Sequence, residues 1–87
     1  MSIEEIILNA IDLPEATPTD QLDARDLPPP HPLRDTLERL PELPEGTVLI
    51  QLNNRAPQHL YPRLDDRGYE YETFELEGDV VTAIWKE

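Results

Sequence analysis

The clearest hydrophobic patterns in the chain predict three strands in its second half. Residues 47–53, TVLIQLN, are rich in β-branched and apolar side chains, which is typical of a buried strand. Residues 80–86, VVTAIWK, have the same character and predict a closing strand. Between them residues 69–77, YEYETFELE, alternate in one phase up to Thr73 and in the other from Phe74. We interpret this phase change as a bulge or a strong twist.

Leucines at helical spacing predict a helix that starts at Pro32, with His31 near its N-cap. The leucines of its inner face stand at i, i+4 and i+7: Leu33, Leu37 and Leu40. Two i,i+4 ion pairs are expected on its outer face: Arg34–Glu38 and Asp35–Arg39. Pro41 and Pro44 end the helix, because proline lacks the N–H that the helix interior requires.

A second, shorter helix is predicted from Leu60 to Leu64, with Gly68 as the residue that ends it. Leu22 to Ala24 form a short strand candidate before the proline-rich corner LDARDLPPPHPL, and Gly78-Asp79 predicts a tight turn. The order of elements is then β-α-β-α-β-β. It predicts an α/β (α+β) two-layer sandwich, in which a four-stranded mixed sheet carries two helices on one face.

Residues 1–21 differ from the rest in composition. SIEEIILNAI has apolar residues at helix-like spacing, and DLPEATPTDQ with its two prolines is typical of a linker. We expect residues 1–21 to be an N-terminal arm and linker, with a frayed tail favoured over a docking or oligomerising segment. Residues 22–87 are expected to form the domain.

The balance of acidic and basic residues adds the most to this interpretation of the chain. Nineteen acidic residues stand against seven basic ones, the formal net charge is −12, and Lys86 is the single lysine. Nucleic acid is disfavoured as a partner, because its binding depends on Lys and Arg that neutralise phosphates. The periodic leucines argue against a disordered acidic chain. The composition is typical of a folded domain adapted to high salt, that is, a halophilic one.

Cysteine is absent, which excludes disulfides, thiolate metal ligands and a nucleophilic thiol. No apolar run approaches the roughly 20 residues of a membrane span, and MSIEEIILNA lacks the basic start of a secretory signal. We therefore expect a cytoplasmic protein without membrane contact. No Ser/His/Asp order, glycine-rich phosphate loop or HExxH motif is present, so no catalytic residue, cofactor or metal ligand is assigned.

The candidate binding residues cluster at the proline corner and at the loop after the second strand: Arg25, His31, Arg34, Arg55 and His59. The arginines suit an anionic group of a ligand or partner. Two other interpretations stay open: His31 as a capping or surface histidine, and a metal site formed by His31 and His59 with Asp23.

The corner resembles the sulfur carriers of the TusA/SirA group, which carry LDxxGLxCPxP before their first helix. The matching residues are Leu22, Asp23, Leu27, Pro30 and Pro32. Pro29 occupies the position of the family's cysteine, so sulfur transfer by this chain is excluded.

The chain is more closely similar to the domain of unknown function 2249 family, cysteine-free relatives of that fold. The resemblance lies in LDxR-xLPP-xHPL at residues 22–33 and in a loop N-D-H-x-P-x-x-L at residues 53–60, in which Asn54-Arg55 replaces the Asp-His pair. Such relatives often occur beside hemerythrin-like and nitrogen-oxide or redox proteins, which implies a partner in redox, sulfur or metal metabolism.

These observations predict a non-catalytic small binding or adaptor protein with a protein partner, as a monomer or weak oligomer. The alternative is a small metal- or anion-binding protein that uses His31 and His59. A third interpretation is an accessory to an enzyme that itself supplies the cysteine.

The high-salt interpretation predicts that the free energy of unfolding rises with KCl concentration, because salt screens the repulsion among the carboxylates. Denaturation curves recorded at several KCl concentrations measure this dependence. Equal stability at low and high KCl would contradict the interpretation.

Overall fold

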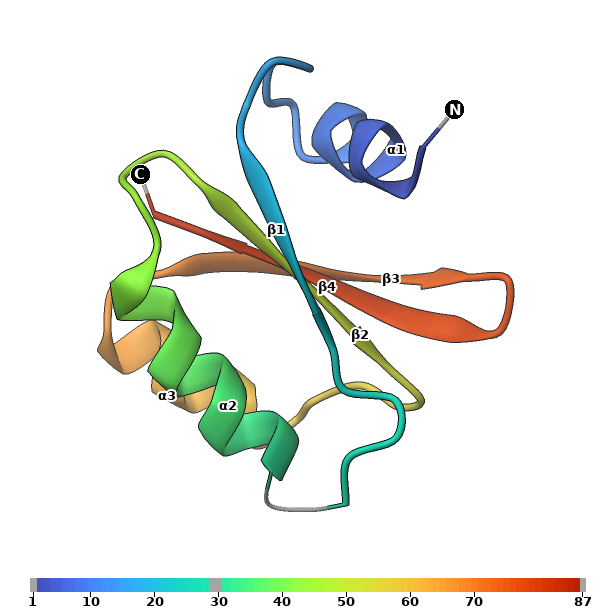
Figure 1. Ribbon diagram of the computed structural model, residues 1–87, viewed down its shortest axis with the longest axis vertical. Helices are drawn as coiled ribbons and strands as arrows, with labels where there is room; N and C mark the ends of the chain where they lie inside the picture. Colours follow the sequence, from blue (N-terminus) through green and yellow to red (C-terminus); the bar gives the residue numbers. More distant parts are fainter. Residues whose placement is uncertain (1, 29–30, 87) are drawn as a thin grey trace.

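The computed structural model describes residues 2–28 and 31–86 and contains a four-stranded sheet with helices on both faces (Figure 1). The elements are α1 (Ile3–Ala10), β1 (Thr19–Asp23), α2 (His31–Arg39), the 3-10 turn η1 (Leu40–Glu42), β2 (Val48–Asn53), α3 (Leu60–Asp66), β3 (Glu70–Leu76) and β4 (Asp79–Trp85). From β1 onward the order is the predicted β-α-β-α-β-β. No helix in the described part of the chain is both long and apolar enough to cross a membrane.

The strands lie in the order β1-β2-β4-β3. β1 and β2 are parallel, whereas β4 is antiparallel to both β2 and β3. This is the predicted mixed sheet, and α2 and α3 pack on one of its faces as expected. Because β1 and β2 are parallel, the loops that follow them leave the sheet at the same edge.

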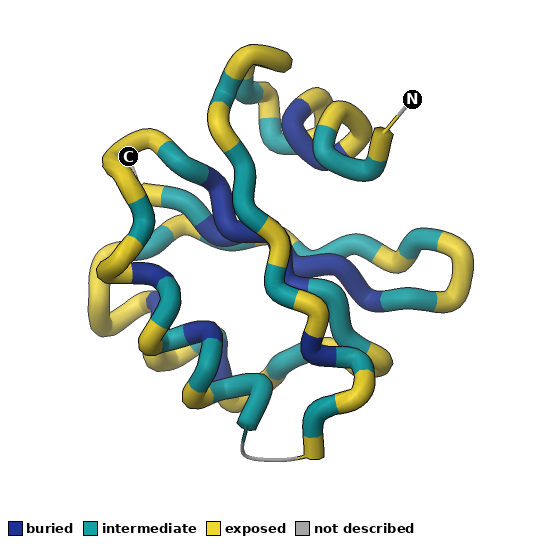
Figure 2. The backbone as a smooth tube through the Cα atoms, in the orientation of Figure 1, coloured by how far each residue is buried: buried dark blue, intermediate teal, exposed yellow. Residues whose placement is uncertain are grey.

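The central strand β2 is buried on both faces of the sheet. Val48 and Ile50 belong to one hydrophobic cluster, and Leu49 on the opposite face belongs to another. Figure 2 shows how the buried positions concentrate where the strands cross the middle of the molecule. A strand with apolar side chains on both faces requires helices or loops over both.

Helix α1 covers the face of the sheet that lies opposite α2 and α3 (Figure 1). Ile7 and Leu8 are 0% and 1% exposed and pack in the cluster that contains Val48 and Ile50. The side chain of Ser2 accepts a hydrogen bond from the N–H of Glu5 and caps the helix. We expected residues 1–21 to be an arm and linker, but they contain this packed helix and the start of β1. The expected boundary at residue 22 therefore falls inside a strand.

The phase change in β3 is not a bulge, so that part of the prediction was wrong, whereas the strong twist given beside it stays a prediction. The β3–β4 ladder is continuous, from Glu70 opposite Trp85 to Leu76 opposite Asp79. Tyr71 packs on the α2/α3 side, whereas Phe74 and Leu76 pack on the α1 side. The pattern changes phase because both faces of the sheet have a hydrophobic core.

The turns follow from backbone angles that few residues adopt easily. Glu77 and Gly78 both have positive φ, 52° and 87°, so the β3–β4 turn is centred one residue before the predicted Gly78-Asp79. Gly68 has φ of 79° directly after the C-cap of α3, as predicted.

Buried polar contacts fix α2 above the sheet. The Thr36 hydroxyl donates to the Pro32 carbonyl at 2.7 Å, and the Gln51 amide donates to the Thr36 oxygen at 2.7 Å. Both side chains are fully buried, so each bond is made in a medium where an unpaired polar group is costly.

The ion pairs expected along the outer face of α2 do not form. Arg39 pairs with Asp20 of β1 at 2.9 Å, and Arg34 lies 3.9 Å from Asp35. The Arg39–Asp20 pair joins α2 to the edge strand, a contact between distant parts of the chain that helical spacing alone does not reveal.

Candidate functional site

The loops after β1 and β2 lie against each other at one edge of the sheet. The Ala24 N–H donates to the Leu52 carbonyl at 2.8 Å and continues the β1–β2 pairing into the first loop. The Asn54 side-chain amide then donates to the Arg25 carbonyl at 2.6 Å. These two bonds hold the proline corner and the second loop in a fixed relation.

A cavity of about 580 Å³, which we call the notch, lies between these loops and the first turns of α2 and α3. Its lining combines apolar and polar side chains: Arg25, Leu27, Pro32, Leu33, Asn53, Asn54, Arg55, Ala56, Pro57, Gln58, His59 and Leu60. The notch lies at the corner and the second loop, where the sequence placed the candidate binding residues, and whether it binds anything stays a prediction.

Arg25 is held in a network of carboxylates. Its Nε and Nη2 donate to the two oxygens of Asp23 at 2.9 and 2.7 Å, and its Nη1 donates to Asp79 at 3.1 Å. The hydrogen bonds from the Arg25 side chain, followed by that from its N–H, lower the pKa of Asp23 from 3.8 to about 2. The side-chain hydrogen bond to Asp23 and the charge of that carboxylate raise the pKa of Arg25. Arg25 thus fastens the first loop to β4, and its guanidinium is already occupied.

Arg55 and His59 are exposed and line the notch. Among residues 2–28 and 31–86, no carboxylate lies within 4.0 Å of the Arg55 guanidinium. His59 stands at the N-cap of α3, but its side chain makes no capping bond. These two side chains are the polar groups of the predicted set that face the notch without a described ionic partner.

His31 and Arg34 are close to the notch but do not line it. The Arg34 Nη2 lies 2.5 Å from the Nδ1 of His31, one helical turn away on α2. A guanidinium is always a donor, so the Nδ1 of His31 is the acceptor of this bond. The predicted set therefore divides into Arg25, Arg55 and His59 in the notch and His31 and Arg34 beside it.

Comparison with known proteins identifies the family. The model of the family described as "Uncharacterized conserved protein (DUF2249)" matches residues 21–86. The chain belongs to the DUF2249 family. The resemblance inferred from the proline corner and the second loop is therefore confirmed, and the family region includes every residue that lines the notch.

A solved structure of a SirA-like protein from Desulfitobacterium hafniense is similar to this DUF2249 chain. The two share 28% sequence identity with a TM-score of 0.65, over 77% of this chain and 97% of the other. The SirA-like fold is thus shown. The comparison with curated proteins found no match.

Some site predictions for this DUF2249 chain remain without a structural test. Pro29, at the position of the sulfur carriers' cysteine, lies outside the described residues. Within the described ranges no three His, Cys, Asp or Glu side chains are grouped in a way that suits a metal ion.

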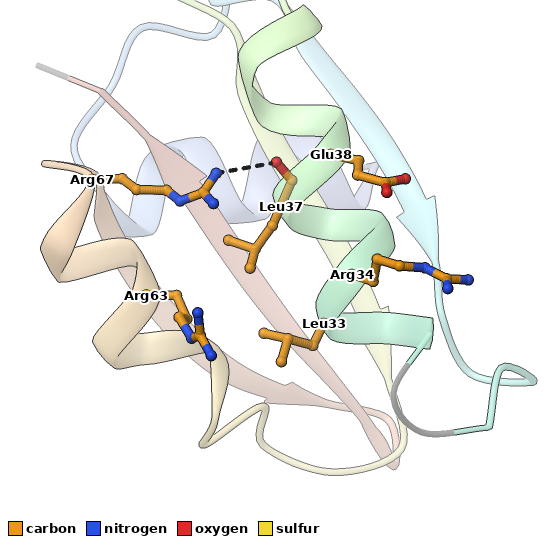
Figure 3. A pocket seen from close by; sticks show the side chains of 6 residues that line it. All are labelled: Leu33, Arg34, Leu37, Glu38, Arg63 and Arg67. Atoms are coloured by element: carbon orange, nitrogen blue, oxygen red, sulfur yellow. Dashed lines mark hydrogen bonds between the residues drawn. The ribbon is translucent and has the colours of Figure 1, made fainter.

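The sequence reasoning missed a second hollow, of about 320 Å³, between α2 and α3 (Figure 3). Its lining residues are Leu33, Arg34, Leu37, Glu38, Arg63 and Arg67. The signal was present in the sequence, because Arg63 and Arg67 stand at i and i+4 beside the inward-facing Leu60 and Leu64.

The hydrogen bonds from the Arg25 side chain to Asp23, which we call the Arg25 clamp, have a measurable consequence. A lowered folded-state pKa contributes stability above pH 3.8, and this contribution is lost as the pH falls from about 4 to 2. We predict that Arg25→Gln returns the pKa of Asp23 toward 3.8, measured from its carboxyl ¹³C shift. The control Arg39→Gln removes the pair with Asp20 and leaves Asp23 unchanged. An Asp23 pKa near 3.8 in the unmodified protein would contradict the clamp.

Proposed function

We propose that this protein is a non-catalytic, cytoplasmic binding or adaptor protein whose notch holds an anionic group of a protein partner. The supporting observation is the notch itself, a cavity of about 580 Å³ at the joined ends of β1 and β2. Ligand cavities of proteins generally fall between about 300 and 1,000 Å³ and combine an apolar lining with a few polar groups.

The lining of the notch is suited to a group with an apolar and a charged part. Leu27, Leu33 and Leu60 provide apolar surface from three different segments. Arg55 provides a planar guanidinium, which matches a carboxylate or phosphate with two parallel hydrogen bonds. His59 and the nearby side-chain amides add donors at the rim.

Arg55 supplies the positive charge that an anion would meet at this site, although the whole protein is acidic. Arg25 forms ion pairs with Asp23 and Asp79, so its network keeps one net negative charge. Arg55 is not included in that network and adds a positive charge to the opposite loop. An anion that approaches the notch therefore meets a guanidinium, whereas the protein as a whole carries a net charge of −12.

The kind of partner follows from the family resemblance. Sulfur carriers of this fold present a cysteine at the proline corner, and this chain has none. We propose that the corner keeps the recognition part of that role without the transfer step. The expected partner is a protein of redox, sulfur or metal metabolism, which includes an enzyme that itself supplies the cysteine.

The alternative, a metal-binding protein that uses His31 and His59, is less well supported. The Arg34 guanidinium occupies the Nδ1 lone pair of His31, and a metal ion at that nitrogen would have to displace it. Thermal unfolding with and without zinc or iron distinguishes the two functions. A metal-dependent rise in Tm that His59→Ala abolishes would favour the alternative.

The double variant Arg55→Ala/His59→Ala tests the proposal, since it removes the two open polar groups and leaves the Arg25 clamp in place. We predict that the unmodified protein captures a specific redox, sulfur or metal protein from native extract at high salt. Quantitative mass spectrometry should show at least a tenfold loss of that protein with the double variant.

The control Lys86→Ala removes a positive charge outside the notch, where the Lys86 ammonium lies 5.0 Å from the Tyr69 ring. It should capture the partner as the unmodified protein does. Equal capture by the double variant and the control would contradict the proposal.

A further inference from the structure

The hollow between α2 and α3, which we call the arginine groove, has two unlike walls. Leu33 and Leu37 of α2 form one wall, and Arg63 and Arg67 reach in from the side of α3 (Figure 3). Arg34 and Glu38 leave α2 on the side away from α3 in the same view. The groove thus offers apolar surface on one side and guanidinium groups on the other.

Arg67 is anchored across the groove. Its Nη1 donates to the Leu37 carbonyl at 3.4 Å. In a continuing α-helix that carbonyl would accept from the N–H of residue 41, but residue 41 is a proline. The bond holds the Arg67 guanidinium across the groove, between α3 and α2.

Arg63 is exposed, and among the described residues no carboxylate lies within 4.0 Å of it or of Arg67. The chain has only seven basic residues against nineteen acidic ones. Three of the seven, Arg34, Arg63 and Arg67, line this one groove together with a single carboxylate, that of Glu38. In the described part of the chain, Arg63 and Arg67 lack the ion pairs that hold Arg25 and Arg39. The charge of the groove is therefore opposite to that of the protein as a whole.

The spacing of the two arginines indicates what fits. Residues at i and i+4 of a helix are about 6 Å apart along its axis. Alternate residues of an extended chain are about 6.6 Å apart and point to the same side, while the residue between them points to the other. An extended acidic-apolar-acidic segment thus matches both walls of the groove.

We propose that the arginine groove binds a short acidic segment of a partner protein in extended form. Two carboxylates, two residues apart, pair with Arg63 and Arg67, and the apolar side chain between them packs on Leu33 and Leu37. The groove and the notch share Leu33, but Arg63 and Arg67 line only the groove. Variants of these two arginines therefore test the proposal independently of the function proposed for the notch.

The apolar wall of the groove decides which kind of acidic partner binds. Two exposed guanidinium groups alone stabilise a small anion little, because exposed ion pairs contribute little. A peptide segment adds apolar contact with the leucines to the paired charges. At about 0.15 M salt, charges more than about 8 Å away are largely screened, so the arginines dominate locally.

A fluorescein-labelled peptide of alternating glutamate and leucine residues is the probe, and fluorescence anisotropy at about 0.15 M salt measures its affinity. Arg63→Glu should weaken binding at least tenfold. The control Lys86→Glu makes the same change in charge outside the groove and should stay within twofold of the unmodified protein. Circular dichroism confirms that both variants are folded, and Arg63→Gln tests the loss of the guanidinium without charge reversal.

Two further measurements complete the test. The same peptide with glutamine in place of glutamate should bind at least tenfold more weakly, and amide shifts in NMR spectra should map the glutamate peptide to α2 and α3. Unchanged binding by Arg63→Glu, equal affinity for the glutamine peptide, or shifts confined to the notch would each overturn the proposal. Dimerisation through this groove in sedimentation experiments would also overturn it, because the occupant would then be a second copy.

Discussion

The double-sided burial of strand β2 is the constraint on which the rest of the structure depends. Val48 and Ile50 face one side of the sheet and Leu49 and Gln51 face the other, and all four are almost fully buried. Because β2 carries apolar side chains on both faces, neither face of the sheet can be left to water. Helix α1 covers one face and the α2/α3 pair covers the other, so the N-terminal segment is part of the folded unit.

Both candidate binding surfaces follow from this arrangement. The parallel pairing of β1 with β2 brings the proline corner and the second loop to one edge, and the Asn54–Arg25 bond joins them into the notch. Helices α2 and α3 cover the same face of the sheet, and the hollow between them becomes the arginine groove. In a protein with a net charge of −12, these are two places where arginines face a cavity.

Local patterns in the sequence predicted the elements from β1 onward and the sheet class, and the candidate binding residues chosen from it include Arg25, Arg55 and His59 of the notch. The predictions that failed depended on contacts between distant segments. The second phase of β3 was interpreted as a bulge or a strong twist because the cover that Ile7 and Leu8 provide over the other face of the sheet was not foreseen. Arg25 stays a predicted binding residue, but its ion pair with Asp79, 54 residues away, was not foreseen. Neither contact can be predicted from the residue pattern of a single helix or strand.

The central claim is that α1 is an integral cover of the sheet, and Ile6 and Ile7 test it as a matched pair. The Ile7 side chain is 0% exposed and that of Ile6 is 39% exposed on the same helix. Ile7→Ala should lower the free energy of unfolding by about 2–5 kcal/mol, whereas Ile6→Ala should change it by about 0.5 kcal/mol or less. Chemical denaturation measures both values. Two small and equal changes would show that α1 does not cover the sheet and would contradict the account.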